Sequence, residues 1–531
     1  MGIFTTVPVK KPRMSAFDLS YNNFFTCDMG ELIPAFKMHI VPSDRVQYSP
    51  TFQVRFAPML NPVFGDIYAK MECFFIPYRL CWDKWKAYIT GVAQEDGTDS
   101  AGTSFLVPKV VPSVGLTTSV ASAPYKPSEI LPAARLVDFL GGVGFYRYVD
   151  SRVKAGDTWA NADKEFQFNC LPFRAYTLVW NEYYRDEFVD KVASFGAGAA
   201  EKTSNHRFYW GDANRDFNYY GIFRRRWSKD YFTTATPEPQ LGSQGAGVNV
   251  SVGGNDINSL SAFFTVAQFR VANALQRFLE RTNIGGGRYN EFILAHFGCM
   301  PTDATIQRPE FLGSVTAPVQ VSAVANTAGG TGADVTIENS TGSFAGVASA
   351  VGTSLCFRRS FKEYGIILGL FSVFPRPIYS DGVQRYLSYG VKADIVNAGA
   401  SPDRFKFGMP EFSGIGDQVI NASELYTGSY ISFTQGFGYQ QRYAEFKFNH
   451  DEVHGDFALD DKLPQYTFAR FFKNSPALNS SFLECNPRKD PFVIISNAGG
   501  QSGTTVQTCW VQLRNNVKAI RPFPKFSTPT L

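Results

Sequence analysis

The sequence predicts an all-β fold, a single antiparallel β-sandwich with large helical and loop insertions between its strands. Aromatic residues make up 15% of the 531 residues, with 49 Phe and 25 Tyr, and such side chains favour pleated, half-buried surfaces. The 46 Gly and 30 Pro are typical of β proteins with long irregular loops. Segments that alternate like strands fall in the first eighty and the last hundred and seventy residues, and the region between them reads as helices and loops.

The first strands are predicted from period-two alternation. In Thr51–Ala57 the residues Phe52, Val54 and Phe56 share one face, and Ile67–Phe75 repeats the pattern. Later strands are predicted at five segments: Gly365–Phe374, Tyr430–Phe437, Tyr439–Phe448, Phe492–Ser496 and Thr505–Leu513.

The middle of the chain has a different pattern. Apolar residues at three-and-four spacing predict helices over Pro172–Lys191 and Ser259–Thr282, and shorter helices are expected at Trp82–Thr90 and Pro132–Leu140. Small and polar residues predict long loops at Gly91–Lys126 and Ala317–Thr353. These connections favour one expanded sandwich over a string of domains.

Charge is balanced overall but concentrated at the two ends. The net charge is +4, yet Lys10, Lys11 and Arg13 precede the first acid, Asp18. No acid follows Asp490, whereas four basic residues do: Arg514, Lys518, Arg521 and Lys525. The two ends therefore indicate either a contact with a polyanion or two solvated tails. For the contact, the predicted DNA-binding residues are Lys10, Lys11, Arg13, Arg521 and Lys525.

The densest basic cluster is Arg224, Arg225 and Arg226, flanked by Phe223 and Trp227. Arginines with flat rings are typical of sites for single-stranded nucleic acid. The favoured alternative is a salt-bridge cluster that faces acids such as Asp212, Asp216 and Asp230.

No constellation of an enzyme or a metal site is evident. The eight cysteines lack zinc-like spacing and read as buried thiols. The pair His450 and His454 lacks the Glu that a zincin motif places after its first His, so these read as surface or inter-subunit histidines. Gly285–Gly287 follows a predicted helix instead of opening one, which indicates a helix end and no phosphate loop. We predict no enzyme, no cofactor and no metal.

Membrane insertion and secretion are not expected either. The first thirteen residues lack the apolar run of a signal peptide. The most apolar stretch, Ile366–Phe374, is about half the length of a membrane helix. The interpretation is a protein made in a reducing cytoplasm.

Nine segments, in order along most of the chain, resemble the major capsid protein of the microviruses, in particular gokushovirus-like members. They are Phe17–Ser20, Cys27–Pro34, Phe56–Met59, Phe74–Trp82, Leu171–Tyr176, Trp180–Asp186, Asp230–Pro237, Gln307–Gly313 and Gly438–Glu445. One departure is Leu241–Asn258, which is short where such relatives carry a long insertion, so three-fold protrusions are expected to be reduced or absent.

The resemblance implies a jelly roll, residues 17–531, behind a basic N-terminal arm, residues 1–16, with insertions concentrated in residues 82–357. It implies a T=1 icosahedral shell of sixty copies, with five-fold, three-fold and two-fold contacts, around a circular single-stranded DNA genome. The implied partners are a small basic DNA-binding protein, a pilot protein, a scaffolding protein and a receptor on the bacterial host.

Two other functions fit the β-rich composition. One is a carbohydrate-active jelly-roll enzyme or lectin, for which no acid–base pair stands out. The other is a spike or another minor virion protein, which would form a trimer or pentamer.

Overall fold

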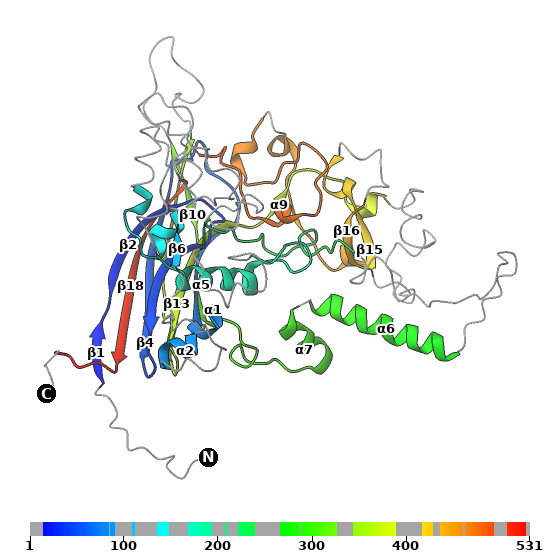
Figure 1. Ribbon diagram of the computed structural model, residues 1–531. Coiled ribbons are helices and arrows are strands. Elements are labelled where there is room, and N and C mark those ends of the chain that lie inside the picture. The colour runs from blue at the N-terminus through cyan, green and yellow to red at the C-terminus, as the bar shows by residue number, and fades with distance from the viewer. Residues whose placement is uncertain are drawn as a thin grey trace, which may run out of the picture.

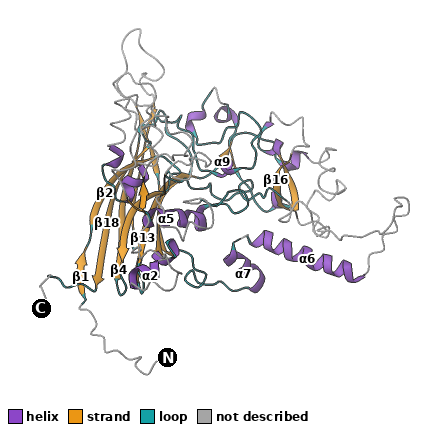
Figure 2. Ribbon diagram, viewed as in Figure 1, coloured by secondary structure: helices purple, strands orange, loops and turns teal. Residues whose placement is uncertain are grey.

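A computed structural model describes residues 14–83, 85–90, 109–111, 135–147, 168–193, 208–209, 221–238, 266–286, 288–325, 344–388, 417–427, 436–459, 462–492 and 507–526. Two antiparallel sheets form a sandwich, and long excursions extend from one side of it (Figure 1). The long strands lie in the sandwich, and the helices lie outside it together with short strands such as β16 (Figure 2).

The larger sheet has seven strands. They are β1 (Ser15–Asp18), β2 (Tyr21–Cys27), β4 (Arg45–Phe56), β10 (Gln320–Ala325), β11 (Phe344–Thr353), β12 (Phe357–Ser360) and β18 (Cys509–Arg521). In β4 every second residue from Val46 to Phe56 is buried, and β18 alternates in the same way. This sheet therefore has one face in the core and one polar outward face.

The smaller sheet runs β3 (Ile33–Ile40), β13 (Gly365–Pro375), β5 (Ile67–Pro77), β9 (Glu310–Pro318). Every residue of β13 is buried. The reason is that Ile367 and Phe371 face the larger sheet, while Leu368 and Leu370 pack against a helical layer on the other side. A strand covered on both faces reads as a continuous apolar run.

The order of the eight main strands confirms the predicted jelly roll. Counted along the chain as β2, β3, β4, β5, β9, β11, β13 and β18, they pair as first–eighth–third–sixth in one sheet and second–seventh–fourth–fifth in the other. Aromatic pairs bind the sheets together across the core: Phe36 stacks on Tyr48 at 4.1 Å, and Phe52 meets Phe371 edge-on at 5.4 Å between centroids.

Two long connections hold most of the remaining elements. Residues 78–309, between β5 and β9, contain α1 (Tyr78–Cys81), α2 (Trp85–Thr90), β6 (Lys109–Val111), β7 (Phe168–Asn169), α5 (Leu171–Val179), the π-helix η3 (Trp180–Tyr184), β8 (Phe208–Tyr209), α6 (Val266–Gly285) and α7 (Tyr289–Phe297). This connection lies largely within the predicted insertion range, residues 82–357.

The second connection, residues 376–508, lies outside that range and joins β13 to β18. Its elements are short: β14 (Ile378–Tyr379), η8 (Arg385–Ser388), β15 (Asp417–Asn421), η10 (Ala422–Glu424), β16 (Gly436–Gln441), η12 (Ala444–Phe446), β17 (Asp451–Glu452), η13 (Gly455–Ala458), η14 (Pro464–Tyr466) and α9 (Ser480–Leu483). They surround a separate small core that includes Phe232, Ile420, Phe437 and Phe482.

Three predicted elements were wrong in part. The expected loop Ala317–Thr353 contains β10 and β11, because small uncharged side chains hide the alternation but leave the backbone free to pair. The helix expected over Pro172–Lys191 ends at Tyr184, and its last five residues form a π-helix. The strand expected over Tyr439–Phe448 stops at Gln441 and gives way to a 3-10 turn.

Candidate nucleic-acid interface

The outward face of the seven-stranded sheet carries a row of basic side chains. The alternation of β4 and β18 turns Arg45 and Lys518 outward, and β12 adds Arg358 beside them. These three residues line a groove of about 700 Å³. None of them forms an ion pair with any residue that the structure describes, so the groove presents uncompensated positive charge to a ligand.

One carboxylate, Asp18, shares this groove with the basic side chains. Its oxygen Oδ1 accepts hydrogen bonds from the Ser20 hydroxyl at 2.5 Å and the Ser20 amide at 3.0 Å. These two bonds, aided by Lys518 and Arg514, hold the pKa of Asp18 below its ordinary value. Asp18 therefore stays ionised in mild acid and offsets part of the positive charge.

Both ends of the described chain lie at one end of this sheet (Figure 1). β1 pairs antiparallel with β18, so that Ser15 stands opposite Arg521. Lys525 is exposed beyond the strand, whereas Arg521 donates to buried Asp44 at 2.8 Å. Lys10, Lys11 and Arg13 lie outside the described residues. Ser15 and Ala16, which the sequence placed in the arm, are the first two residues of β1.

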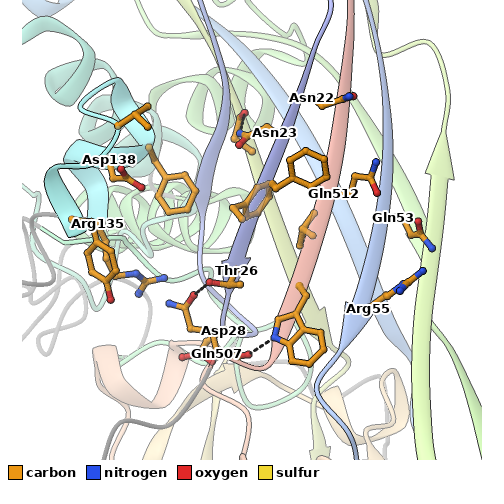
Figure 3. A pocket seen from close by; sticks show the side chains of 18 of the residues that line it. Asn22, Asn23, Thr26, Asp28, Gln53, Arg55, Arg135, Asp138, Gln507 and Gln512 are labelled. Atoms are coloured by element: carbon orange, nitrogen blue, oxygen red, sulfur yellow. Dashed lines mark hydrogen bonds between the residues drawn. The ribbon is translucent and has the colours of Figure 1, made fainter. Parts of the chain in front are cut away.

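A wider groove of about 1510 Å³ lies along β2 on the same outward face, at the ends of β4 and β18 opposite to the first groove (Figure 3). Amide side chains line it, among them Asn22, Gln53 and Gln512, and Arg55 stands beside Trp510 across the β4–β18 pair. Phe24 is 69% exposed and Trp510 is 37% exposed. Exposed rings flanked by amides and a guanidinium can stack on unpaired bases and bond their edges.

Other basic groups in this groove are already engaged. Arg135 makes two hydrogen bonds of 2.9 Å to Glu31, and Lys489 contacts Asp28 at 2.7 Å. Lys37 donates to the carbonyl of Phe139 at 2.6 Å. Of the described cations that line this groove, Arg55 is therefore the one that offers its positive charge to a ligand.

The three consecutive arginines form ion pairs within the chain. Arg225 contacts Glu72 at 2.9 Å, Arg226 contacts Asp190 at 2.6 Å, and Arg224 contacts Glu484 at 3.4 Å. These partners differ from the acids that the sequence pointed to: Asp230 receives the hydroxyl of Tyr379, and Asp212 and Asp216 lie outside the described residues. The geometry favours the salt-bridge interpretation, and DNA contact by these arginines stays a prediction.

The Arg225–Glu72 pair is largely buried, with exposed side-chain fractions of 18% and 11%. The guanidinium also lies over the ring of Phe374 at 4.1 Å, and Glu72 accepts the hydroxyl of Tyr184 at 2.8 Å. Burial raises the pKa of Glu72, but Arg225 and Lys70 lower it more, so that it stays below its ordinary value. The pair therefore joins the helical layer to the smaller sheet.

Among the described residues no group of three metal-binding side chains is present, and no helix is both long and apolar enough to cross a membrane. In the pair His450 and His454, both imidazoles face the carboxylate of Glu452. The distances from their Nε2 atoms to its oxygens are 3.4 Å for His450 and 3.2 Å for His454.

Jelly rolls are found in the shell proteins of viruses, and also in lectins and cupins. The chain belongs to the family of phage capsid proteins described as Capsid protein (F protein), which matches residues 5–125, 140–263 and 255–531. It is therefore a structural protein of the virion and not an enzyme.

Three similar proteins carry the name Capsid protein VP1, and all come from microviruses. The protein of Bdellovibrio phage phiMH2K is 26% identical over 91% of this chain and 90% of its own length. Those of Chlamydia phage 1 and Spiroplasma virus 4 are 24% and 22% identical, over 99% and 95% of this chain and 97% and 93% of their own lengths. The resemblance stated from the nine segments is thereby confirmed.

Proposed function

We propose that sixty copies of this chain close a T=1 icosahedral shell around a circular single-stranded DNA genome. The observation that carries the genome contact is the uncompensated basic groove of Arg45, Arg358 and Lys518, next to the place where both chain ends leave the sheet. A closed shell needs such charge on its inner side, because phosphates bring many negative charges into a small volume.

In this proposal the outward face of the seven-stranded sheet is turned toward the DNA. The groove of Arg45 and the terminal residues, Lys10, Lys11, Arg13 and Lys525, contact phosphates. Trp510 and Phe24 stack on bases toward the other end of the same face. The long connections then lie on the side that meets neighbouring copies and the bacterial surface.

The proposal includes further partners of the same phage. A small basic DNA-binding protein would add to the positive charge that the groove of each copy supplies. A pilot protein would act in delivery of the genome, and a scaffolding protein would act in assembly. A receptor on the host surface would meet the outward loops. Family membership supports these partners, and no contact with them is drawn from the structure.

The test is the mass and the nuclease-resistant DNA content of native particles, by size exclusion with light scattering. Sixty chains of 59.0 kDa give about 3.5 MDa of protein. We expect a particle of that protein mass with protected single-stranded DNA. Particles from infected cells below about 0.4 MDa would contradict the shell and favour a small oligomer such as a spike.

A further inference from the structure

Helix α6 carries an apolar stripe that the described chain leaves uncovered. Val271, Leu275 and Phe278 follow one another at helical spacing, with exposed fractions of 68%, 47% and 44%. The neighbouring helix α7 reaches only the end of this stripe, where the ring of Phe278 meets Phe292 at 5.8 Å. No described side chain of α6 is buried.

The helix stands away from the sandwich, to which α7 and the segment after it connect it (Figures 1 and 2). Most helical stability in proteins comes from packing an amphipathic face against a partner, and helices without one are marginal in water. A twenty-residue helix with one bare apolar stripe therefore indicates a partner outside the residues that the structure describes.

The charges of α6 restrict what that partner is. Arg270, Arg277 and Arg281 recur at seven- and four-residue spacing, so they form a second stripe about 100° around the helix from the apolar one. None of them forms an ion pair with a described residue. Against these three cations the helix has one acid, Glu280, so two α6 helices would repel each other. The complementary surface is apolar and acidic.

The second long connection presents a surface of this kind. It surrounds a cavity of about 340 Å³ lined by Glu424, Glu445 and Glu452 against one guanidinium, Arg385. Glu424 is buried and contacts Arg385 at 3.1 Å, so the negative charge near the surface comes from Glu445 and Glu452. Burial lowers the pKa of His450 in the same cavity, so this side chain is neutral at pH 7 and adds no positive charge.

Exposed apolar side chains come from η8 and from the segment Phe446–Phe448, and two of them, Tyr386 and Phe448, line this cavity. Leu387 and Tyr386 are 66% and 56% exposed, and Phe446 and Phe448, on either side of Lys447, are 57% and 55% exposed. Four large apolar groups on a patch this small mark a contact site, because soluble surfaces rarely gather them.

We propose that the α6 stripe of one copy docks on the surface around this cavity in a neighbouring copy. Val271 and Leu275 then cover Leu387 and Phe448, and the arginine stripe faces Glu445 and Glu452. A contact between two different patches is heterologous, and such contacts close into rings when the rotation permits. The inference rests on the proposed shell and names one of its subunit contacts.

The first test introduces charge into the apolar stripe of the full-length protein. Val271→Asp with Leu275→Asp places two carboxylates in the contact without touching the core. We expect the fraction of chain in particles to fall at least about tenfold, with an unchanged circular dichroism spectrum. Val192→Asp, at a valine that is 63% exposed in another part of the chain, is the matched control and is expected to assemble. Normal assembly of the double variant would overturn the inference.

The second test fixes the partner and does not depend on how well the variants fold in isolation. In a Cys299→Ser background, which removes an exposed thiol, Leu275→Cys and Leu387→Cys are made singly and together. A short bismaleimide linker is expected to join chains in particles of the double variant and to leave both single variants as monomers on a denaturing gel. Joined chains from Leu275→Cys alone would show paired α6 helices and would overturn the docking.

These outcomes separate the inference from the proposed shell. If the unsubstituted chain forms no particle, the shell fails first. If it forms particles of about 3.5 MDa and the double-cysteine variant gives no joined chains, the shell stands and the docking of α6 is wrong.

Discussion

Two basic regions of this chain use their charge in opposite ways. The cluster Arg224–Arg226 is dense in the sequence, yet each arginine has a carboxylate partner within the chain. Arg45, Arg358 and Lys518 are far apart in the sequence, yet they line one groove and form no ion pair with described residues. Density of positive charge along a sequence therefore predicts an ion-pair network as readily as a nucleic-acid site, whereas the open charge of the groove becomes visible only once the strands are placed.

The largest effect is expected from breaking the buried cluster. Glu72→Ala leaves the Arg225 guanidinium without its partner, and the loss of one member of such a pair costs about 3–5 kcal/mol of the free energy of unfolding. Denaturant unfolding of the unassembled chain measures it. The double variant Arg225→Met with Glu72→Leu is expected to recover much of the loss, since the buried guanidinium is removed together with its partner and only Lys70, which is more exposed, loses its contact with Glu72.

An equal loss in the single and the double variant would contradict this view of the cluster. In that case the contacts of Tyr184 and Phe374 with the pair, and not the charge interaction, would stabilise this part of the fold.

The next effect concerns the open groove and is electrostatic, with little change in stability. Replacing Arg45, Arg358 and Lys518 by Gln removes three phosphate contacts. The measurement is the binding of an oligodeoxythymidine at several salt concentrations. Each lost phosphate contact changes the slope of log affinity against log salt by about 0.7, so we expect the slope to become shallower by about 2. Surface substitutions of this kind change the free energy of unfolding by about 0.5 kcal/mol or less each.

The matched control is Lys447→Gln, Lys462→Gln and Lys473→Gln, which removes the same charge from exposed sites on the second long connection. It is expected to leave the salt slope unchanged. Equal slopes for both triple variants would show that net charge, and not the groove, binds the DNA.

A smaller effect is expected from the N-terminal tail. Neutralising Lys10, Lys11 and Arg13 together is expected to reduce the DNA packaged per particle, because these residues precede β1 at the end of the sheet where the groove lies. The ratio of absorbance at 260 and 280 nm in purified particles measures it. Unchanged DNA content in assembled variant shells would refute a role for the tail.

The sequence predicted the sandwich well because alternation is strong where one face is buried, as in β4 and β18. It failed for β10 and β11, whose Ala, Ser, Gly and Val side chains give little contrast between faces. The jelly-roll order came from the resemblance, since strand pairing between β2 and β18, about 480 residues apart, leaves no local signal.

The candidate site was predictable only in part. Acid-free ends pointed to Arg521 and Lys525, but Arg521 is engaged by Asp44, and the groove residues Arg45 and Arg358 were missed. They carry no motif and meet only through the β4–β12 register, in which Ser360 stands opposite Arg45 and Arg358 opposite Gln47. In the sequence, each of them is only a basic residue on the polar side of a strand. That position predicts a shared groove only when the pairing of the strands is known.

The smallest effect is expected from the carboxylate of the open groove. Asp18→Asn removes negative charge next to Lys518 and is expected to raise the affinity for an oligodeoxythymidine by no more than a few-fold, since the site is exposed to solvent and screened by salt. Because the Ser20 hydrogen bonds lower the pKa of Asp18, the carboxylate remains charged as the pH falls from 7 to 5. The unsubstituted groove should therefore bind equally at both pH values, and so should Ser20→Ala, because the ordinary pKa of 3.8 also leaves Asp18 ionised at pH 5. Binding that rises for the unsubstituted chain over this range would mean that another group in the groove titrates, and would remove Asp18 from the account.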